Sequence, residues 1–459
     1  MVKTISQLAI DLSTGEVTSA TLVEQYLAAI DDALGEGSRT FIAVYRDAAR
    51  RGALAVDRAR ASGAALGPLA GIPISIKDLF DVAGEVTRAG STILANAPPA
   101  GRDAPAIARL KAAGVILMGR TNMTEFAYGG HGTNCHYGTP LNPWDRATKR
   151  IPGGSTSGGA VSVTDGMAAA AIGSDTGGSV RIPAALCGLA GYKPTQARVP
   201  LAGAFPLSPT RDSIGPLGVS ANCCILLDRA MAGESISTRE PASLRGLTFG
   251  VPTTILLDKL DQPVERAFAS ALTRISRAGA TIKEFRLQEL QDEFDGSRLV
   301  NFSGYEAYRL HRERLETSEA AFDPRVAKRL MLGANMKEKD YQSLHVLREK
   351  LMASANKTTA GFDALLTPTV PIVAPALAEL DRSDEDLYRI NSLLLRNAAP
   401  FNVLNRPAWS LPCHAAGDAP VGLMVVGETN GDAKLQRLGV AIESALSAQW
   451  STGRSAPRG

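Results

Sequence analysis

The sequence has few cysteines, and their spacing forms no recognisable pair. Five cysteines occur among 459 residues, and no two of them are arranged as C-x-x-C. An odd number without such a spacing fits neither a disulfide framework nor a zinc site. We therefore expect no metal and no disulfide, and a reducing cytoplasm is the simplest location for the protein.

Long apolar runs and long basic runs are also missing. Residues 1–27 carry acidic side chains and no apolar stretch of the signal-peptide type, and runs such as 167–173 are too short to cross a bilayer. The 49 basic and 46 acidic residues give a net charge of +3, and no Lys/Arg run could follow a phosphate backbone. We expect a soluble protein without a direct nucleic-acid or membrane partner.

The patterns that are present predict an α/β fold. A hydrophobic content of 45% over this length is enough for a large core. Apolar residues recur at helical spacing early in the chain, and apolar strand-like runs alternate with further helical stretches. Such alternation is typical of a sheet covered by helices. The expected helices are 19–33, 104–112 and 432–448, and the expected strands are 68–79, 113–118, 247–251, 364–374 and 421–426.

Two glycine-rich segments contain candidate catalytic hydroxyls. In 173–188 (GSDTGGSVRIPAALCG) a small-residue strand leads through glycines into a helical segment that starts near Ser179. Glycines there would let backbone N–H groups converge on one point, as an oxyanion requires. An isolated G-G-S is more often only a capped helix start. A second such loop, 151–163, contains adjacent hydroxyls from Ser155 onward and suggests a shared site.

A nucleophilic serine needs a base, and the sequence offers few histidines for that role. The chain has five histidines, and neither glycine-rich segment spells G-x-S-x-G, so a histidine triad is disfavoured. Lys77 lies in the apolar run GIPISIKD, where burial would lower its pKa toward neutrality. The alternative is a lysine at the sheet edge with its ammonium group in water. The residue alone does not decide between the two.

Three sequence blocks together resemble those of the amidase signature enzymes. The blocks are GIPISIKD at 71–78, IPGGSTSGG at 151–159 and GSDTGGSVRIPAALCGLAGYKPT at 173–195. The resemblance implies one large α/β/α domain around a mixed, many-stranded sheet, spanning residues 66–459. It also implies an N-terminal helical segment over 1–65 and a variable, mainly helical substrate-pocket region at 255–360.

The resemblance also assigns roles to individual residues. The nucleophile falls on Ser179, the bridging serine on Ser155, preceded by a cis peptide bond, and the catalytic lysine on Lys77. The expected oxyanion donors are the N–H groups of Thr176, Gly177, Gly178 and Ser179. We expect a supporting role for Thr156, Asp175 and Arg181, which would hold these groups in position without reacting themselves. Tyr128, Gly129 and Gly130, together with the loop 208–212, are expected to form part of the pocket wall.

The function implied by the resemblance is hydrolysis of a carboxylic amide without a cofactor, through an acyl-enzyme. One alternative is the glutamine-hydrolysing subunit of a tRNA-dependent amidotransferase. Such subunits carry the motif N-M-D-E-F, and Thr124 replaces its acidic third residue here, which disfavours this alternative. A non-catalytic binding protein on the same fold is another alternative. A nucleotide-binding protein is a third, although no G-K-[ST] ending is present. The expected partners are a small amide substrate and, as one option, a second copy of the chain in a homodimer.

Overall fold

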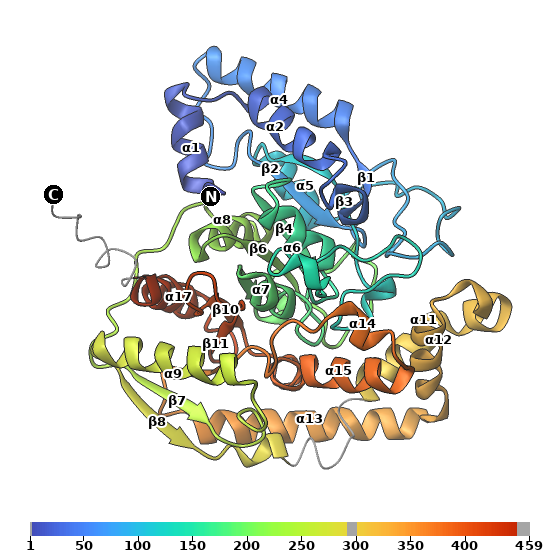
Figure 1. Ribbon diagram of the computed structural model, residues 1–459, viewed down its shortest axis with the longest axis vertical. Helices are drawn as coiled ribbons and strands as arrows, with labels where there is room; N and C mark the ends of the chain where they lie inside the picture. The colour runs from blue at the N-terminus through green and yellow to red at the C-terminus, as the bar shows by residue number, and fades with distance from the viewer. Residues whose placement is uncertain (1, 292–300, 448–459) are drawn as a thin grey trace.

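The computed structural model describes residues 2–291 and 301–447, and its core is one mixed sheet of eleven strands (Figure 1). The strand order is β1-β3-β2-β4-β6-β5-β10-β11-β9-β7-β8. The α/β expectation is therefore confirmed. The strands are β1 (Phe41–Val44), β2 (Pro73–Lys77), β3 (Ile116–Thr121), β4 (Ala170–Ser174), β5 (Ala190–Lys193), β6 (Ile214–Gly218), β7 (Thr248–Pro252), β8 (Thr281–Phe285), β9 (Ala364–Pro368), β10 (Ala408–Pro412) and β11 (Gly422–Val426).

Helices connect and cover the strands. The last residue of the expected helix 432–448, Ala448, lies outside the described residues. The helices are α1 (Ile5–Thr14), α2 (Ser19–Asp31), α3 (Gly37–Thr40), α4 (Arg46–Ala61), α5 (Pro105–Ala112), α6 (Ser157–Thr164), α7 (Arg181–Cys187), α8 (Ala221–Ala232), α9 (Gln262–Arg277), α11 (Asn301–Ser318), α12 (Pro324–Met331), α13 (Glu338–Thr359), α14 (Leu377–Leu380), α15 (Asp384–Arg396), α16 (Ala399–Val403) and α17 (Asp432–Ser447). Short 3₁₀ turns lie at 125–127, 146–148, 196–198, 319–321 and 332–335.

Neighbouring residues of β5 show how helices cover both faces of the sheet. A Cβ on Gly191 would lie 2.7 Å from Ala184 of α7, so α7 packs very closely on that face. The next side chain, Tyr192, donates from its hydroxyl to Asp432 at the start of α17. Because successive strand residues point to opposite faces, α7 and α17 lie on opposite sides of the sheet. The site described below lies on the α7 side.

The N-terminal segment departs from the helical expectation at one place. Residues 41–44 form β1, which pairs antiparallel with β3 and extends the central sheet, so the helical segment expected over 1–65 also contains a strand. A four-residue apolar run carries too little periodicity to reveal a strand whose partner lies far along the chain. Apolar side chains of α2 pack with those of β3 in one cluster. The segment is therefore part of the main fold.

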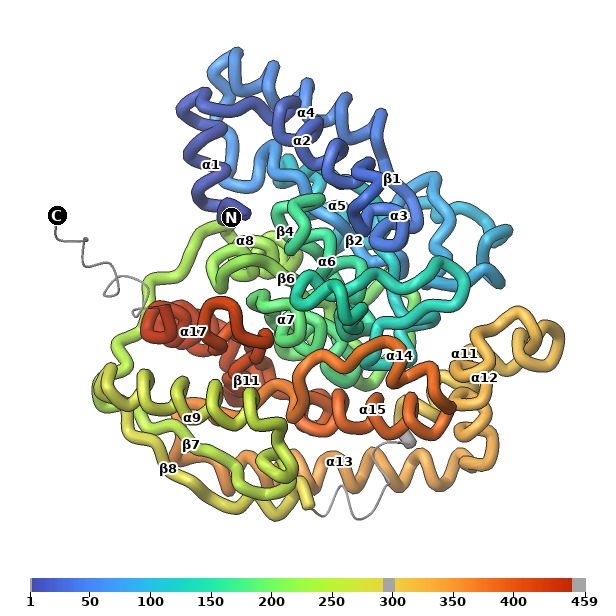
Figure 2. Tube along the Cα trace, in the orientation of Figure 1, coloured from blue at the N-terminus to red at the C-terminus, as the bar shows by residue number. Residues whose placement is uncertain are grey.

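The region expected to be variable is mainly helical where it is described. Helices α11 and α12 lie at the right of the view in Figure 2, and α13 runs across its lower part. Helix α12 contacts α15, because the Tyr388 hydroxyl donates to the carbonyl oxygen of Arg325 (3.1 Å). Residues 292–300 of the expected region lie outside the described residues.

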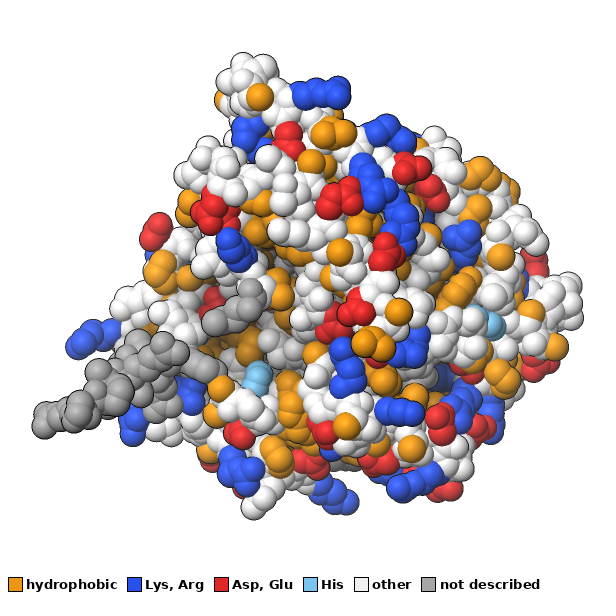
Figure 3. Space-filling model, turned by 45° about the horizontal axis from the view of Figure 1, so that its top comes forward, with side chains coloured by type: hydrophobic (Ala, Val, Ile, Leu, Met, Phe, Trp, Pro, Cys, Tyr) orange, Lys and Arg blue, Asp and Glu red, His pale blue; other side chains and the backbone are white. Residues whose placement is uncertain are grey.

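The outer surface mixes both signs of charge. On the face drawn in Figure 3, basic and acidic side chains are interspersed and do not form a single stripe. Across residues 2–291 and 301–447, no helix combines the length and the apolar character needed to cross a bilayer.

Candidate active site

Lys77 is buried at the end of β2 and contacts two hydroxyl groups. Its Nζ lies 2.7 Å from Oγ of Ser155 and 2.9 Å from Oγ of Ser174. Ser174 is the last residue of β4, which runs parallel to β2 as its neighbour. Parallel neighbours end at the same edge of a sheet, so the two strands bring the amine and this hydroxyl together. Of the two alternatives that the sequence leaves open, a buried lysine and a sheet-edge lysine with its ammonium group in water, the structure shows the buried one, with an exposure of 0%.

The burial of Lys77 changes its protonation. Loss of water lowers the pKa of the ammonium group from 10.5 to about 7, and the negative charges of Asp175 and Asp212 oppose this shift only in part. A large fraction of the side chain is therefore neutral at pH 7. A neutral amine can accept a hydrogen bond, and then a proton, from the Ser155 hydroxyl across the same 2.7 Å contact.

Ser155 lies in a loop that is connected to the loop of Ser179. The peptide bond between Gly154 and Ser155 is cis, as the resemblance implies. The N–H of Gly154 donates to the carbonyl oxygen of Gly130 (2.7 Å), and the N–H of Thr156 donates to that of Ser179 (3.3 Å). The bond between Thr156 and Ser179 joins the two glycine-rich loops, which therefore lie side by side.

A buried ion pair supports the loop that carries Ser179. Arg181 donates from Nη2 (2.9 Å) and Nε (3.0 Å) to the carboxylate of Asp175, and both side chains are inaccessible to water. Burial acts to raise the pKa of Asp175, but the charge and the hydrogen bonds of Arg181 outweigh it and lower the pKa. Asn402 adds a further hydrogen bond from Nδ2 to the same carboxylate (2.9 Å). Asp175 is therefore ionised, and its carboxylate is occupied by these donors.

The backbone around Ser179 offers three unused donors. In the described parts of the chain, the N–H groups of Thr176, Gly177 and Ser179 have no acceptor, and all three residues line one pocket. The expected fourth donor differs, because the N–H of Gly178 donates to Oδ1 of Asp175 (2.8 Å). The φ angle of +123° at Gly178 is one that side-chain-bearing residues rarely adopt, which explains the glycine.

Thr156 supports the site by packing. Its hydroxyl is buried and has no hydrogen-bond partner among the described residues. A Cβ placed on Gly173 of β4 would lie 2.5 Å from this Oγ1, so the two residues are already in close contact. Thr156 therefore fills the space between β4 and the start of α6, directly beside the Ser155 backbone.

Sequence reasoning missed Ser174 as a partner of the lysine. The sequence gives one hint of this role, because Ser174 is a hydroxyl residue in G-S-D, directly before the turn that carries Ser179. A motif does not show which way the last side chain of a strand points. The contact became visible only when the register of β2 and β4 was known.

Ser179 opens into a pocket of about 640 Å³. Tyr128 and Gly129 line it as expected, whereas Gly130 is not among its lining residues. The N–H of Gly130 donates to Oδ1 of Asn391 (2.8 Å), which does line the pocket. Arg211, from the expected loop 208–212, also lines it. Other lining residues come from the 255–360 region: Ser303, Gly304, Lys328, Arg329, Leu332, Gly333 and Met336.

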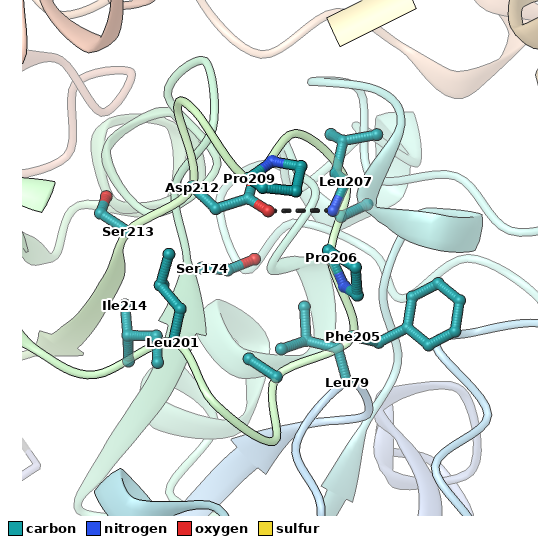
Figure 4. Close-up of a pocket in the computed structure, with 12 residues that line it drawn as sticks. Leu79, Ser174, Leu201, Phe205, Pro206, Leu207, Pro209, Asp212, Ser213 and Ile214 are labelled. Carbon is teal, nitrogen blue, oxygen red and sulfur yellow. Dashed lines mark hydrogen bonds between the residues drawn. The ribbon is translucent and has the colours of Figure 1, made fainter. Parts of the chain in front are cut away.

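A second, smaller cavity of about 70 Å³ adjoins Ser174 (Figure 4). Its wall is mostly apolar, with Leu79, Phe205 and Ile214 among the lining side chains. Asp212 also lines it, and burial raises the pKa of this carboxyl group to about 6.

The part of the chain that the structure describes contains no group of three or more His, Cys, Asp or Glu side chains arranged to hold a metal ion.

Comparisons with known proteins show what the chain as a whole is similar to. The family model for amidases matches residues 21–435. The chain is 35% identical to 2-amino-5-chloromuconic acid deaminase of Comamonas testosteroni, over 87% of this chain and 86% of that protein. It is 33% identical to a glutamyl-tRNA(Gln) amidotransferase subunit of Chloroflexus aggregans, over 98% and 97%. A crystal structure of an amidase superposes with a TM-score of 0.86 at 35% identity, covering 96% of this chain and 99% of the other.

Proposed function

Because the chain belongs to the amidase family, we propose that it hydrolyses a carboxylic amide, other than a peptide bond, through an acyl-enzyme on Ser179. The observation that carries this proposal is the 2.7 Å contact between Nζ of Lys77, whose pKa is about 7, and Oγ of Ser155. Through this contact Lys77 can act as the base for the nucleophilic serine, for which the sequence offers no histidine in a recognisable triad motif. We propose a cytoplasmic location and, for the assembly, a homodimer, which light scattering of the purified protein would test.

The proposed reaction moves one proton along three side chains. Neutral Lys77 accepts the proton of Ser155, which takes the proton of Ser179 as the Ser179 oxygen attacks the carbonyl carbon. The unused N–H groups near Ser179 stabilise the resulting oxyanion. The relay then returns the proton to the departing nitrogen, the C–N bond breaks, and an ester remains on Ser179. Water attacks this ester through the same relay and releases the carboxylate.

Replacement of the nucleophile tests the proposal. Ser179→Ala is expected to lower kcat for amide hydrolysis by at least about 10³-fold while leaving the unfolding midpoint unchanged. A fluorophosphonate should label the wild type at Ser179 and leave the variant unlabelled. The matched control is Ser157→Ala, which removes a buried hydroxyl of the neighbouring glycine-rich loop 151–163 and should retain activity and labelling. Wild-type hydrolysis by Ser179→Ala would overturn the assignment.

The pKa of Lys77 sets the expected pH dependence. Below pH 7 the amine carries a proton and cannot accept another, so kcat/KM should fall about tenfold for each further pH unit. Above pH 7 the rate should reach a plateau. Initial rates between pH 5 and 9 measure this, with circular dichroism as the control for folding. A profile that is flat down to pH 5 in folded protein would contradict a lysine base.

A second candidate is a glutamine-hydrolysing subunit of a tRNA-dependent amidotransferase. The similarity to the Chloroflexus amidotransferase protein over nearly the whole chain supports it. Thr124 weighs against it, since it stands where that type has an acidic residue. The purified chain discriminates between the two candidates. Hydrolysis of simple amides by the chain alone supports an independent amidase, whereas a strict need for companion subunits supports the second candidate.

A further inference from the structure

The pocket of Ser179 is lined by side chains of one charge sign. Its basic lining residues are Arg211, Lys328, Arg329 and Arg396, and no Asp or Glu is among its described lining residues. Apolar side chains, including Leu207, Leu332 and Met336, make up much of the remaining wall. A cavity with this composition favours a ligand that has an apolar body and a negative charge.

The basic residues differ in how far their charge is already compensated. Lys328 forms an ion pair with Asp384 (3.2 Å), and 64% of its side chain is exposed to water. Arg329, the next residue, has no carboxylate partner within the described ranges 2–291 and 301–447. Its charge is therefore available to a bound anion. Arg396 also has no ion pair with a carboxylate among these residues, but its guanidinium already donates to the carbonyl oxygens of Asp258 (2.7 Å) and Leu256 (3.3 Å).

Arg329 is also held in a defined position. Its Nη1 donates to the carbonyl oxygen of Tyr128 (3.1 Å), and its guanidinium group lies over the Tyr128 ring, 4.3 Å from the ring centre. A guanidinium fixed in this way loses little conformational entropy when it binds a ligand. Its planar donors match the geometry of a carboxylate.

Arg211 adds positive charge closer to the reacting centre. A Cβ on Gly177 would lie 4.0 Å from Nη2 of Arg211, so this guanidinium is close to the backbone of the oxyanion donors. The charges of Arg329 and Arg211 both act on the buried Tyr128 hydroxyl, where they oppose the rise in pKa that burial causes. The two arginines therefore extend one positive region from Gly177 to the Tyr128 ring.

From this arrangement we infer that the enzyme acts on amides whose acyl part carries a carboxylate, and that Arg329 binds that carboxylate. The inference rests on the proposed function of Ser179. The acyl part stays attached to Ser179 after the amine has left, so an ion pair with Arg329 would hold it through both halves of the reaction. Arg329 is then the residue that sets specificity, and it takes no part in proton transfer.

Matched pairs of probes test the substrate class. Succinamate, glutaramate and adipamate are compared with butanamide, pentanamide and hexanamide, in which a methyl group replaces the carboxylate. With ammonia release as the readout, kcat/KM for at least one anionic probe should exceed that of its neutral partner by about 100-fold or more, as expected when a site satisfies a buried polar group. Equal rates within every pair would overturn the inference.

Variants of helix α12 test the residue. Arg329→Gln should lower the ratio of anionic to neutral kcat/KM by at least about 30-fold, mainly through a higher KM, and Arg329→Lys should restore part of it. The control is Arg325→Gln on the same helix, whose side chain pairs with Asp381 and Asp384 outside the pocket lining. This control should leave the ratio unchanged. An equal loss on both probes in Arg329→Gln would indicate a purely structural role and overturn the assignment.

The two proposals fail in different ways. If Ser179 is not labelled by a fluorophosphonate and no amide is hydrolysed, the proposed function fails. If Ser179 is labelled, or neutral amides are hydrolysed, but no anionic probe is preferred, only the inference about the carboxylate is overturned.

Discussion

The ammonium group of Lys77 costs free energy to bury, so its removal is expected to stabilise the protein. Its pKa is about 7 in the folded state against an ordinary value of 10.5, so between these pH values the unfolded chain binds a proton that the folded protein lacks. This side chain therefore makes stability rise with pH in that window. Lys77→Met should raise the free energy of unfolding by about 1–4 kcal/mol at pH 7, and by less at pH 9.

Urea unfolding at the two pH values measures this effect. Lys339→Met is the matched control, because Lys339 is exposed on α13 and should change stability little at either pH. A Lys77→Met protein that is less stable than the wild type at pH 7 would contradict the prediction. If Lys77 is the catalytic base, its burial lowers the stability of the folded protein and at the same time keeps the amine neutral at the pH where the enzyme works.

The sequence identifies some residues of the site better than others. Lys77, Ser155 and Ser179 lie in short blocks whose glycines and apolar neighbours indicate how each residue is presented. The contact of Ser174 with Lys77 depends on the register of two strands. The loss of Gly178 as a donor depends on the direction of one Asp175 oxygen. Local sequence does not carry either kind of information.

Among the elements, the contact between β4 and the start of α6 leaves no room for an added methyl group. In Gly173→Ala the new Cβ would lie 2.5 Å from Oγ1 of Thr156 and 2.6 Å from its Cγ2, and Thr156 is buried and branched at Cβ. Relief of this overlap should cost about 1–3 kcal/mol of stability. It should also shift the neighbouring Ser155 and lower kcat/KM by at least about tenfold.

Thermal unfolding and initial rates on one amide check this prediction. Gly67→Ala is the matched control, because a Cβ there has no heavy atom within 4 Å. If Gly173→Ala behaves like Gly67→Ala in both measurements, the close contact does not hold Thr156 in place.

Helices and buried strands were predicted from periodicity, but their order in the sheet was not. The run at 364–374 indicates a buried strand, and β9 is found at Ala364–Pro368. Its place between β11 and β7 depends on contacts far apart in sequence. The helix expected to start near Ser179 begins at Arg181, after Val180, whose N–H is bound by Oδ2 of Asp175 (3.2 Å). Side-chain contacts of this kind are not visible in periodicity.

At the scale of the whole molecule, the N-terminal segment and the rest of the chain share one sheet. Strand β1 covers the outer edge of β3 (Figure 1), and Val23 and Leu27 of α2 pack on Ile116 and Met118. A chain that starts at residue 66 would expose this edge and this apolar surface, both of which promote aggregation. We expect it to be insoluble or unfolded.

Expression of residues 1–65 together with the shortened chain provides the control, since it should restore soluble protein. Calorimetry then measures cooperativity. A chain starting at residue 66 that melts in one transition at the wild-type midpoint would show that the segment is a separate unit.

The pocket wall and the proton relay come from different stretches of the chain. Lys77, Ser155 and Ser179 lie before residue 180, whereas much of the wall lies within 303–336 and 388–400. Point mutations in the later stretches can therefore alter which amide is accepted while the groups that break the bond keep their positions. Related genes can therefore diverge in substrate specificity while their catalytic residues stay the same. A mutant library restricted to these stretches would explore the same changes in specificity.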